Sequence, residues 1–85
     1  MENRIALIGI MVEDFDQTDK INAVLHEYSH YIVGRMGIPY RERGINVISV
    51  IIDAPNDAIS ALSGKLGMIR GITAKSMYSK PPAEK

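Results

Sequence analysis

Two short stretches of the sequence carry residue types that could do chemistry, and the first is His26-Glu27-Tyr28-Ser29-His30. It matches HExxH, the helical pattern in which two histidines one turn apart bind zinc and the glutamate acts as general base. A catalytic zinc site needs a third protein ligand, but the chain has no other histidine and no cysteine. No catalytic residue is therefore assigned, and no zinc or other cofactor is expected.

The direction of the two imidazoles also argues against a zinc site. With Ile21 marking the core side of a helix, His26 and His30 fall about 140° and 180° away from it. We expect both to be solvated, and His30 to lie beyond the end of the helix. Metal binding through His26 and His30 between two subunits stays open as an alternative.

The second stretch runs from residue 34 to residue 44 and contains three glycines, at positions 34, 37 and 44, and three arginines, at positions 35, 41 and 43. Glycines 34 and 37 in an edge strand would allow close approach to the backbone, and arginines can grip a carboxylate or another subunit. A twisted edge strand followed by a solvated hairpin loop is the alternative. The candidate ligand-binding residues are Gly34, Arg35, Met36, Gly37, Ile38, Tyr40 and Arg41.

The elements that must position these residues follow from hydrophobic spacing. Apolar residues recur at 21, 24, 25 and 28 and again at 59, 62 and 66, which predicts two amphipathic helices. Extended segments are predicted at 5–12, 32–38, 45–52 and 72–78. Gly67 is expected to end the second helix in the left-handed conformation. The resulting order is strand, helix, strand, strand, helix, strand.

This order predicts an α+β, ferredoxin-like βαββαβ sandwich with two helices on one face of an antiparallel sheet of strand order 4-1-3-2. The first and third strands are then central, and these are the segments 5–12 and 45–52, which are apolar on both alternating faces. The uncovered face would measure roughly 400 to 450 Å², a large apolar patch for a monomer. We predict that a second copy covers it.

The predicted assembly is a homodimer or a homotetramer. Small residues on the outer side of the second helix could let a neighbouring backbone approach closely. The candidate interface residues are Ile8, Ile10, Ile48 and Val50 from the central strands, with Ser60 and Gly64 from this helix.

Composition narrows the class of protein further. Eighty-five residues allow one domain, predicted at 1–78, with a polar, proline-rich flexible tail at 79–85. Ten basic residues balance ten acidic ones, so no field attracts nucleic acid, and direct nucleic-acid binding is not expected. No signal peptide or membrane span is predicted, and the lack of cysteine fits a reducing cytoplasm.

The stretches Leu25-His26-Glu27-Tyr28, Gly34-Arg35-Met36-Gly37-Ile38-Pro39-Tyr40-Arg41 and Leu62-Ser63-Gly64-Lys65-Leu66-Gly67 resemble those of iron-only hydrogenase system regulators. The resemblance covers the chain from Arg4 to about Met77. It implies an ACT-like fold, similar to the C-terminal domain of the nickel-responsive regulator, and small-ligand binding between subunits. The nickel site, which uses three histidines and a cysteine, does not carry over to this chain.

The sequence and the resemblance together predict a non-enzymatic, cytoplasmic regulatory or small-ligand-sensing protein. No DNA-binding segment remains once the six elements are placed, so any control of transcription would act through a protein partner. The main alternative is an accessory or structural subunit that docks onto a metalloenzyme maturation system. The ligand itself is not named by the sequence.

Overall fold

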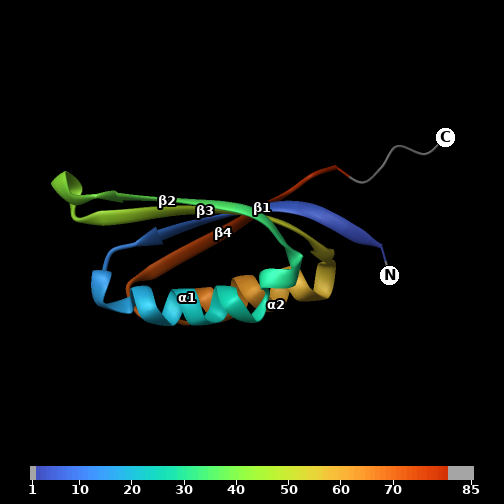
Figure 1. The fold of residues 1–85 in the computed structure, drawn as a ribbon, viewed down its shortest axis with the longest axis horizontal. Coiled ribbons are helices and arrows are strands. Elements are labelled where there is room, and N and C mark those ends of the chain that lie inside the picture. Colours follow the sequence, from blue (N-terminus) through green and yellow to red (C-terminus); the bar gives the residue numbers. More distant parts are fainter. Residues whose placement is uncertain (1, 81–85) are drawn as a thin grey trace.

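A four-stranded antiparallel sheet with two helices on one face is the architecture of the computed structural model, which describes residues 2–80 (Figure 1). The elements are β1 Asn3–Val12, α1 Thr18–Glu27, β2 Ile32–Tyr40, β3 Ile45–Pro55, α2 Asn56–Gly67 and β4 Ile72–Tyr78. The strand order β2-β3-β1-β4 is the predicted 4-1-3-2 order read from the other edge. The ferredoxin-like prediction is therefore confirmed, with β1 and β3 at the centre.

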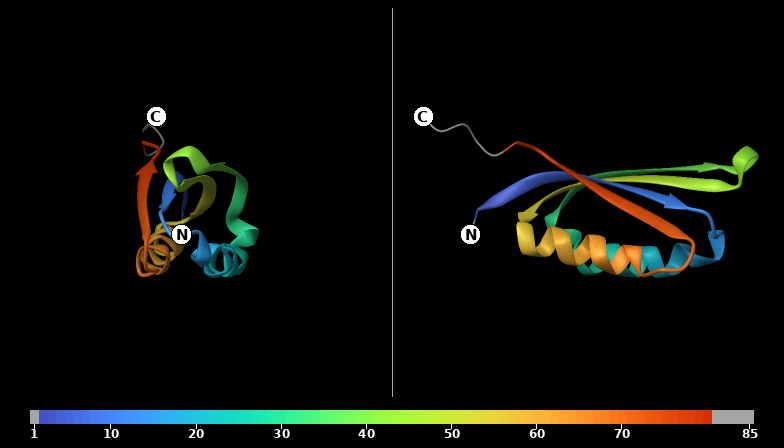
Figure 2. Two further views of the ribbon diagram at one scale, coloured as in Figure 1. Left: turned by 90° about the vertical axis from the view of Figure 1, so that its left-hand side faces the viewer. Right: turned by 180° about the vertical axis from the view of Figure 1, so that it is seen from behind.

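The core lies between the sheet and the two helices, as the end-on view shows (Figure 2). Its buried side chains are all apolar, and none of the described polar side chains is buried. Alternate residues of the two central strands meet the inner faces of the helices, so the pleat of the sheet sets which residues enter the core. The core residues are Ala6, Ile8, Ile10, Val12, Ile21, Leu25, Ile48, Val50, Ile52, Ala54, Ile59, Leu62, Leu66 and Ile72.

The acidic residues at positions 13, 14 and 16 lie before helix α1, in and beside a short 3-10 turn. Asp14 caps a short 3-10 turn by accepting a hydrogen bond from the backbone N–H of Asp16 at 3.0 Å, and the α-helix proper begins at Thr18. Ile21 and Leu25 are fully buried, as the predicted helical face requires. No helix within residues 2–80 has both the length and the apolar character needed to cross a membrane.

The turn from α2 into β4 differs from the prediction. Gly67 is the last residue of the helix and is not left-handed; the left-handed glycine is Gly71, with φ of 79°. The carbonyl of Gly71 accepts the backbone N–H of Glu13 at 2.9 Å, which ties the start of β4 to the end of β1. The left-handed residue of this turn is therefore Gly71, where the chain passes close to Asp14.

The end of β4 and the residue that follows it contact the start of β1. The backbone N–H of Ser79 donates to the carbonyl of Ile5, and the Arg4 guanidinium donates to the carbonyl of Ser79 at 2.6 Å. Arg4 also lies over the ring of Tyr78, 4.8 Å from its centroid. These contacts involve Ser79, the first residue of the predicted tail. The flexibility of that tail stays a prediction, and its residues 81–85 lie outside the described residues.

Gly71 offers a sharp test of this turn. In Gly71→Ala the new Cβ would lie 2.9 Å from the Cβ of Asp14 in a left-handed conformation, so we expect a loss of about 1–3 kcal/mol in unfolding free energy. The matched control is Gly64→Ala in the middle of α2, where nothing lies within 4 Å and alanine should stabilise by about 0.5–1 kcal/mol. Urea denaturation measures the unfolding free energy of both variants. Equal changes in the two would contradict the left-handed conformation and close contact of Gly71.

Candidate functional site

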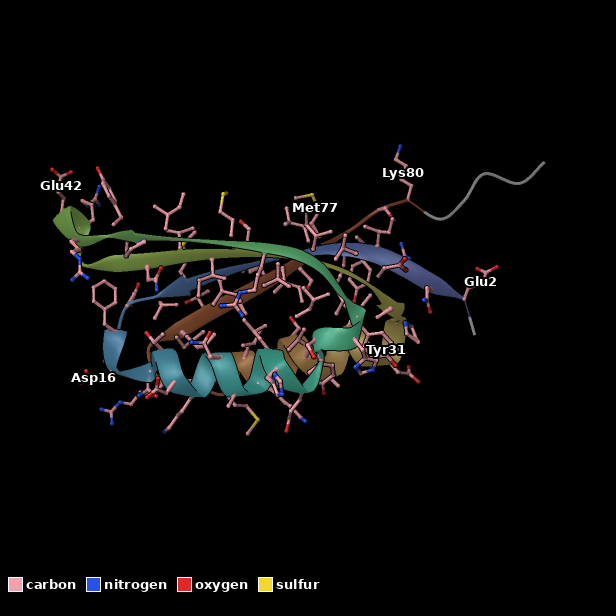
Figure 3. The ribbon with its side chains drawn as sticks, in the orientation of Figure 1. Glu2, Asp16, Tyr31, Glu42, Met77 and Lys80 are labelled. Carbon is pink, nitrogen blue, oxygen red and sulfur yellow. The ribbon has the colours of Figure 1, made fainter. Side chains whose placement is uncertain are left out.

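The face of the sheet that the helices leave uncovered carries most of the exposed large apolar side chains in residues 2–80. The strand register places them together: Leu7 of β1 lies between Ile51 of β3 and Met77 of β4. Met77 points away from the helices (Figure 3). The side chains that form this open face, each between 38% and 66% exposed, are Ile5, Leu7, Met11, Met36, Ile38, Tyr40, Ile51 and Met77.

The four strand residues predicted for the interface do not lie on the open face. They are at most 4% exposed and pack in the core between the sheet and the helices: Ile8, Ile10, Ile48 and Val50. The prediction chose the wrong alternating set, because a strand that is apolar on both faces has no polar residue to show which face meets the helices.

The two helical candidates for the interface lie where the sequence placed them, on the exposed side of α2. Ser60 and Gly64 are both exposed, and their part in an interface stays a prediction.

The middle of the open face is lower than its ends. Gly9 of β1 pairs with Ser49 of β3, and no atom lies within 4 Å of where a Gly9 Cβ would be. Hollows of about 310 Å³ and 540 Å³ flank this centre. The smaller is lined by Ile5, Ala6, Leu7, Ile51, Met77, Tyr78 and Ser79. The larger, beside the hairpin, is lined by Met11, Glu13, Tyr40, Arg43, Gly44, Ile45 and Val47.

The predicted ligand-binding segment 34–44 does not form one site. In β2 the side chains of Met36, Ile38 and Tyr40 share the open face with the position of Gly34, whereas Arg35 and Gly37 lie on the helix side. The alternation of a strand causes this division, since neighbouring side chains point to opposite faces.

Arg35 and Arg41, the two arginines of the predicted ligand-binding set, are also far apart along strand β2. Arg41 lies in the turn Arg41–Arg43 at the tip of the hairpin, which projects beyond the helices, with Glu42 marking the tip (Figure 3). Six residues of extended chain separate Arg35 from Arg41 by roughly 20 Å. Within one chain, therefore, these two arginines are too far apart to bind the same small ligand, and their part in a site between subunits stays a prediction.

A β-bulge determines the side on which Arg35 lies. Ile32 pairs with Ile52, but the next pair is Gly34 with Ile51, so β2 contains one extra residue at Val33. If β2 continued without a bulge in the register that Ile32 sets, Arg35 would pair with Ser49 and face the open side. With it, Arg35 reaches α1, and its Nη2 donates to Oδ1 of Asn22 at 2.9 Å.

The groove between α1 and β2 around this contact combines polar groups with an apolar floor. Its volume is about 270 Å³, and it is lined by Asn22, Leu25, His26, Ser29, Ile32 and Arg35. Sequence reasoning considered Arg35 and His26 separately and missed Asn22 and Ser29. No local signal joins these residues, because a bulge and a helix end bring them together.

The HExxH stretch crosses the end of a helix. Helix α1 ends at Glu27, and His30 lies in the following 3-10 turn Ser29–Tyr31, with its ring centroid 4.1 Å from that of Tyr31. The prediction that His30 lies beyond the helix is confirmed. Among residues 2–80 no three metal-ligating side chains converge on one point. His26 and His30 are both exposed, and metal binding between subunits stays a prediction.

Glu27, the would-be catalytic base, is used to join the two helices. Its Oε1 lies 3.0 Å from Nζ of Lys65 in α2. The carboxylate of Glu27, followed by the phenol of Tyr28, raises the pKa of Lys65 above its ordinary value of 10.5. A raised pKa means that this contact stabilises the fold at pH values below about 10.5 and is lost as the pH rises through the higher folded value.

Comparison with known proteins agrees with this architecture. Residues 4–76 match the model of a family described as "TM1266-like: Iron-only hydrogenase system regulator, putative". The solved structure of the uncharacterized protein TM1266 from Thermotoga maritima is 36% identical, with a TM-score of 0.88, and the match covers 93% of this chain and all of that one. None of the curated proteins matches.

More distant solved structures share the fold alone. A formyltetrahydrofolate deformylase from Pseudomonas putida KT2440 has a TM-score of 0.62 at 15% identity, over 86% of this chain and 28% of that one. An unknown protein from Galdieria sulphuraria has a TM-score of 0.63 at 13% identity, over 96% and 48%.

The structural role of Glu27 is testable by titration. In Glu27→Gln we expect the pKa of Lys65 to fall toward 10.5, because the first cause of the shift is removed. NMR titration of the Lys65 side chain measures this. Asp57→Asn, which removes an exposed carboxylate from the first turn of α2, is the control and should leave the Lys65 titration unchanged. A Lys65 titration that Glu27→Gln does not alter would contradict the contact.

Proposed function

We propose that this chain, which belongs to the TM1266-like family of iron-only hydrogenase system regulators, is a non-enzymatic regulatory protein that acts as a homo-oligomer and senses a small ligand. The family description supports the regulatory role. The open apolar face of the sheet is the single observation that supports the assembly, because exposed apolar patches of this size are typical of interaction surfaces.

The size of the open face suits a pair of identical chains. Four strands of 7 to 11 residues, spaced about 4.8 Å apart and rising about 3.3 Å per residue, project to roughly 600 Å². The accessible surface is larger than this projection because the side chains are corrugated. Stable interfaces bury about 800 Å² per partner. Two open faces packed against each other come close to that area.

The charge of the chain also favours a second copy. The protein has no net charge at pH 7, so two copies do not repel each other. Within the described strands the open face carries one charge of each sign, Lys75 of β4 opposite Gly9 and Asp53 of β3 opposite Ile5. Face-to-face packing of two antiparallel sheets is a standard way of burying such a surface.

In the proposed function, the regulator responds to the binding of a small ligand. The exposed edge of β2 offers arginine side chains at two separate places, beside α1 and at the hairpin tip. Binding at either place to an assembled protein would let the ligand alter a surface that a protein partner reads. The partner, and any effect on hydrogenase maturation or transcription, belongs to this proposal.

The assembly is tested by placing a charge among the apolar side chains of the open face. Ile51→Lys, with Met77→Lys as a second and more exposed position, should convert a dimer or tetramer into a monomer, because an ammonium group would be desolvated at the interface. Sedimentation equilibrium gives the mass, and circular dichroism checks the fold. Met68→Lys is the control, since Met68 is 87% exposed but lies outside the sheet.

Three results would overturn the assembly through this face. One is a wild-type protein that is monomeric at all concentrations. Another is an oligomer that survives both substitutions in the sheet. The third is a monomer that forms a stable complex only with a maturation protein, which would establish the accessory-subunit function instead.

A further inference from the structure

The groove between α1 and β2 lies on the opposite side of the sheet from the open face. Its lining residues come from the second half of α1, the following turn and the first half of β2. The two hollows that flank the centre of the open face would be covered by a second copy, since Leu7, Met11, Ile51 and Met77 line them. This groove would stay accessible in the assembled protein.

Arg35 supplies the charge in this groove. Its guanidinium has five N–H donors, and one hydrogen bond, from Nη2 to Asn22, is made within the protein. The only ion pair in residues 2–80 joins Lys65 and Glu27, so no described carboxylate neutralises Arg35. The guanidinium is therefore held in place by Asn22 while most of its donors are available to an anion.

The other polar groups of the groove have complementary chemistry. The amide of Asn22, the hydroxyl of Ser29 and the imidazole of His26 can each donate a hydrogen bond. Leu25 and Ile32 provide an apolar floor beside them. The groove thus pairs a cationic end with a short apolar surface.

We propose that this groove binds a small aliphatic carboxylate, with the carboxylate on the Arg35 guanidinium and the aliphatic body against Leu25 and Ile32. The inference rests on the proposed sensing function and names its ligand class. A planar guanidinium matches a carboxylate through two parallel hydrogen bonds. The volume of about 270 Å³ equals roughly nine water volumes, which suits a ligand of only a few heavy atoms.

Phosphate is a poorer match for this groove. Phosphate sites in proteins commonly use several cations or the N–H groups at the start of a helix. Here a single arginine faces the second half of α1, where the helix dipole is negative, and the floor is apolar. A monoanion with an apolar body satisfies this arrangement better than a compact dianion.

The test is an NMR titration of the wild-type protein with sodium butyrate, followed at the side-chain signals of Arg35 and Asn22. We expect saturable shifts at these signals. In Arg35→Met the dissociation constant should rise by about 10- to 100-fold, because a charged hydrogen-bond partner is lost. Arg70→Met is the matched control: it removes the same charge from the exposed turn between α2 and β4 and should leave binding unchanged.

A second variant tests the same site without removing the arginine. Asn22→Asp places a carboxylate beside Arg35, where it should compete with butyrate and weaken binding, while the protein stays folded. 1-Butanol, which has the aliphatic body without the carboxylate, should not produce saturable shifts.

Each of several results would overturn the carboxylate site: shifts that never saturate, equal losses in Arg35→Met and Arg70→Met, or saturation by phosphate in place of butyrate. The oligomeric mass is measured on the same samples. An intact oligomer that ignores butyrate overturns this inference alone, whereas a monomer overturns the proposed assembly.

Discussion

Both helices pack on the same side of the sheet, and this leaves half of a strongly apolar sheet uncovered. The central strands β1 and β3 are apolar on both alternating faces, but the helices can bury only one of them. The covered half forms the core, in which every buried side chain is apolar. The uncovered half carries most of the exposed large apolar side chains of the described residues, and for this reason assembly is central to the function that we propose.

The edge strand β2 divides its side chains between these two environments. A single extra residue at Val33 shifts the alternation, so that Met36, Ile38 and Tyr40 join the open face while Arg35 turns toward α1. The bulge at Val33 therefore affects two surfaces. It adds apolar side chains to the open face, and it places the Arg35 cation beside the polar side of α1. Bulges are often found where a strand has to redirect a side chain in this way.

Much of the fold was predictable because it depends on local patterns. Helical spacing of apolar residues located α1 and α2, and the doubly apolar runs identified β1 and β3 as the central strands. The candidate site was predicted less well. Ile8, Ile10, Ile48 and Val50 were assigned to the wrong face, and residues 34–44 were treated as one site although strand alternation divides them. HExxH matched by letter but spans the end of a helix.

The sequence by itself determined the element order, the central strands and the presence of a second apolar face, because hydrophobic periodicity and turn residues act over a few neighbouring positions. Only the tertiary structure decided which alternating set of β1 and β3 faces the helices, that Gly71 rather than Gly67 is left-handed, and that Arg35 meets Asn22. These features depend on the register between strands distant in sequence and on the contact of β2 with α1. A single residue inserted at Val33 changes that register without leaving a local signal.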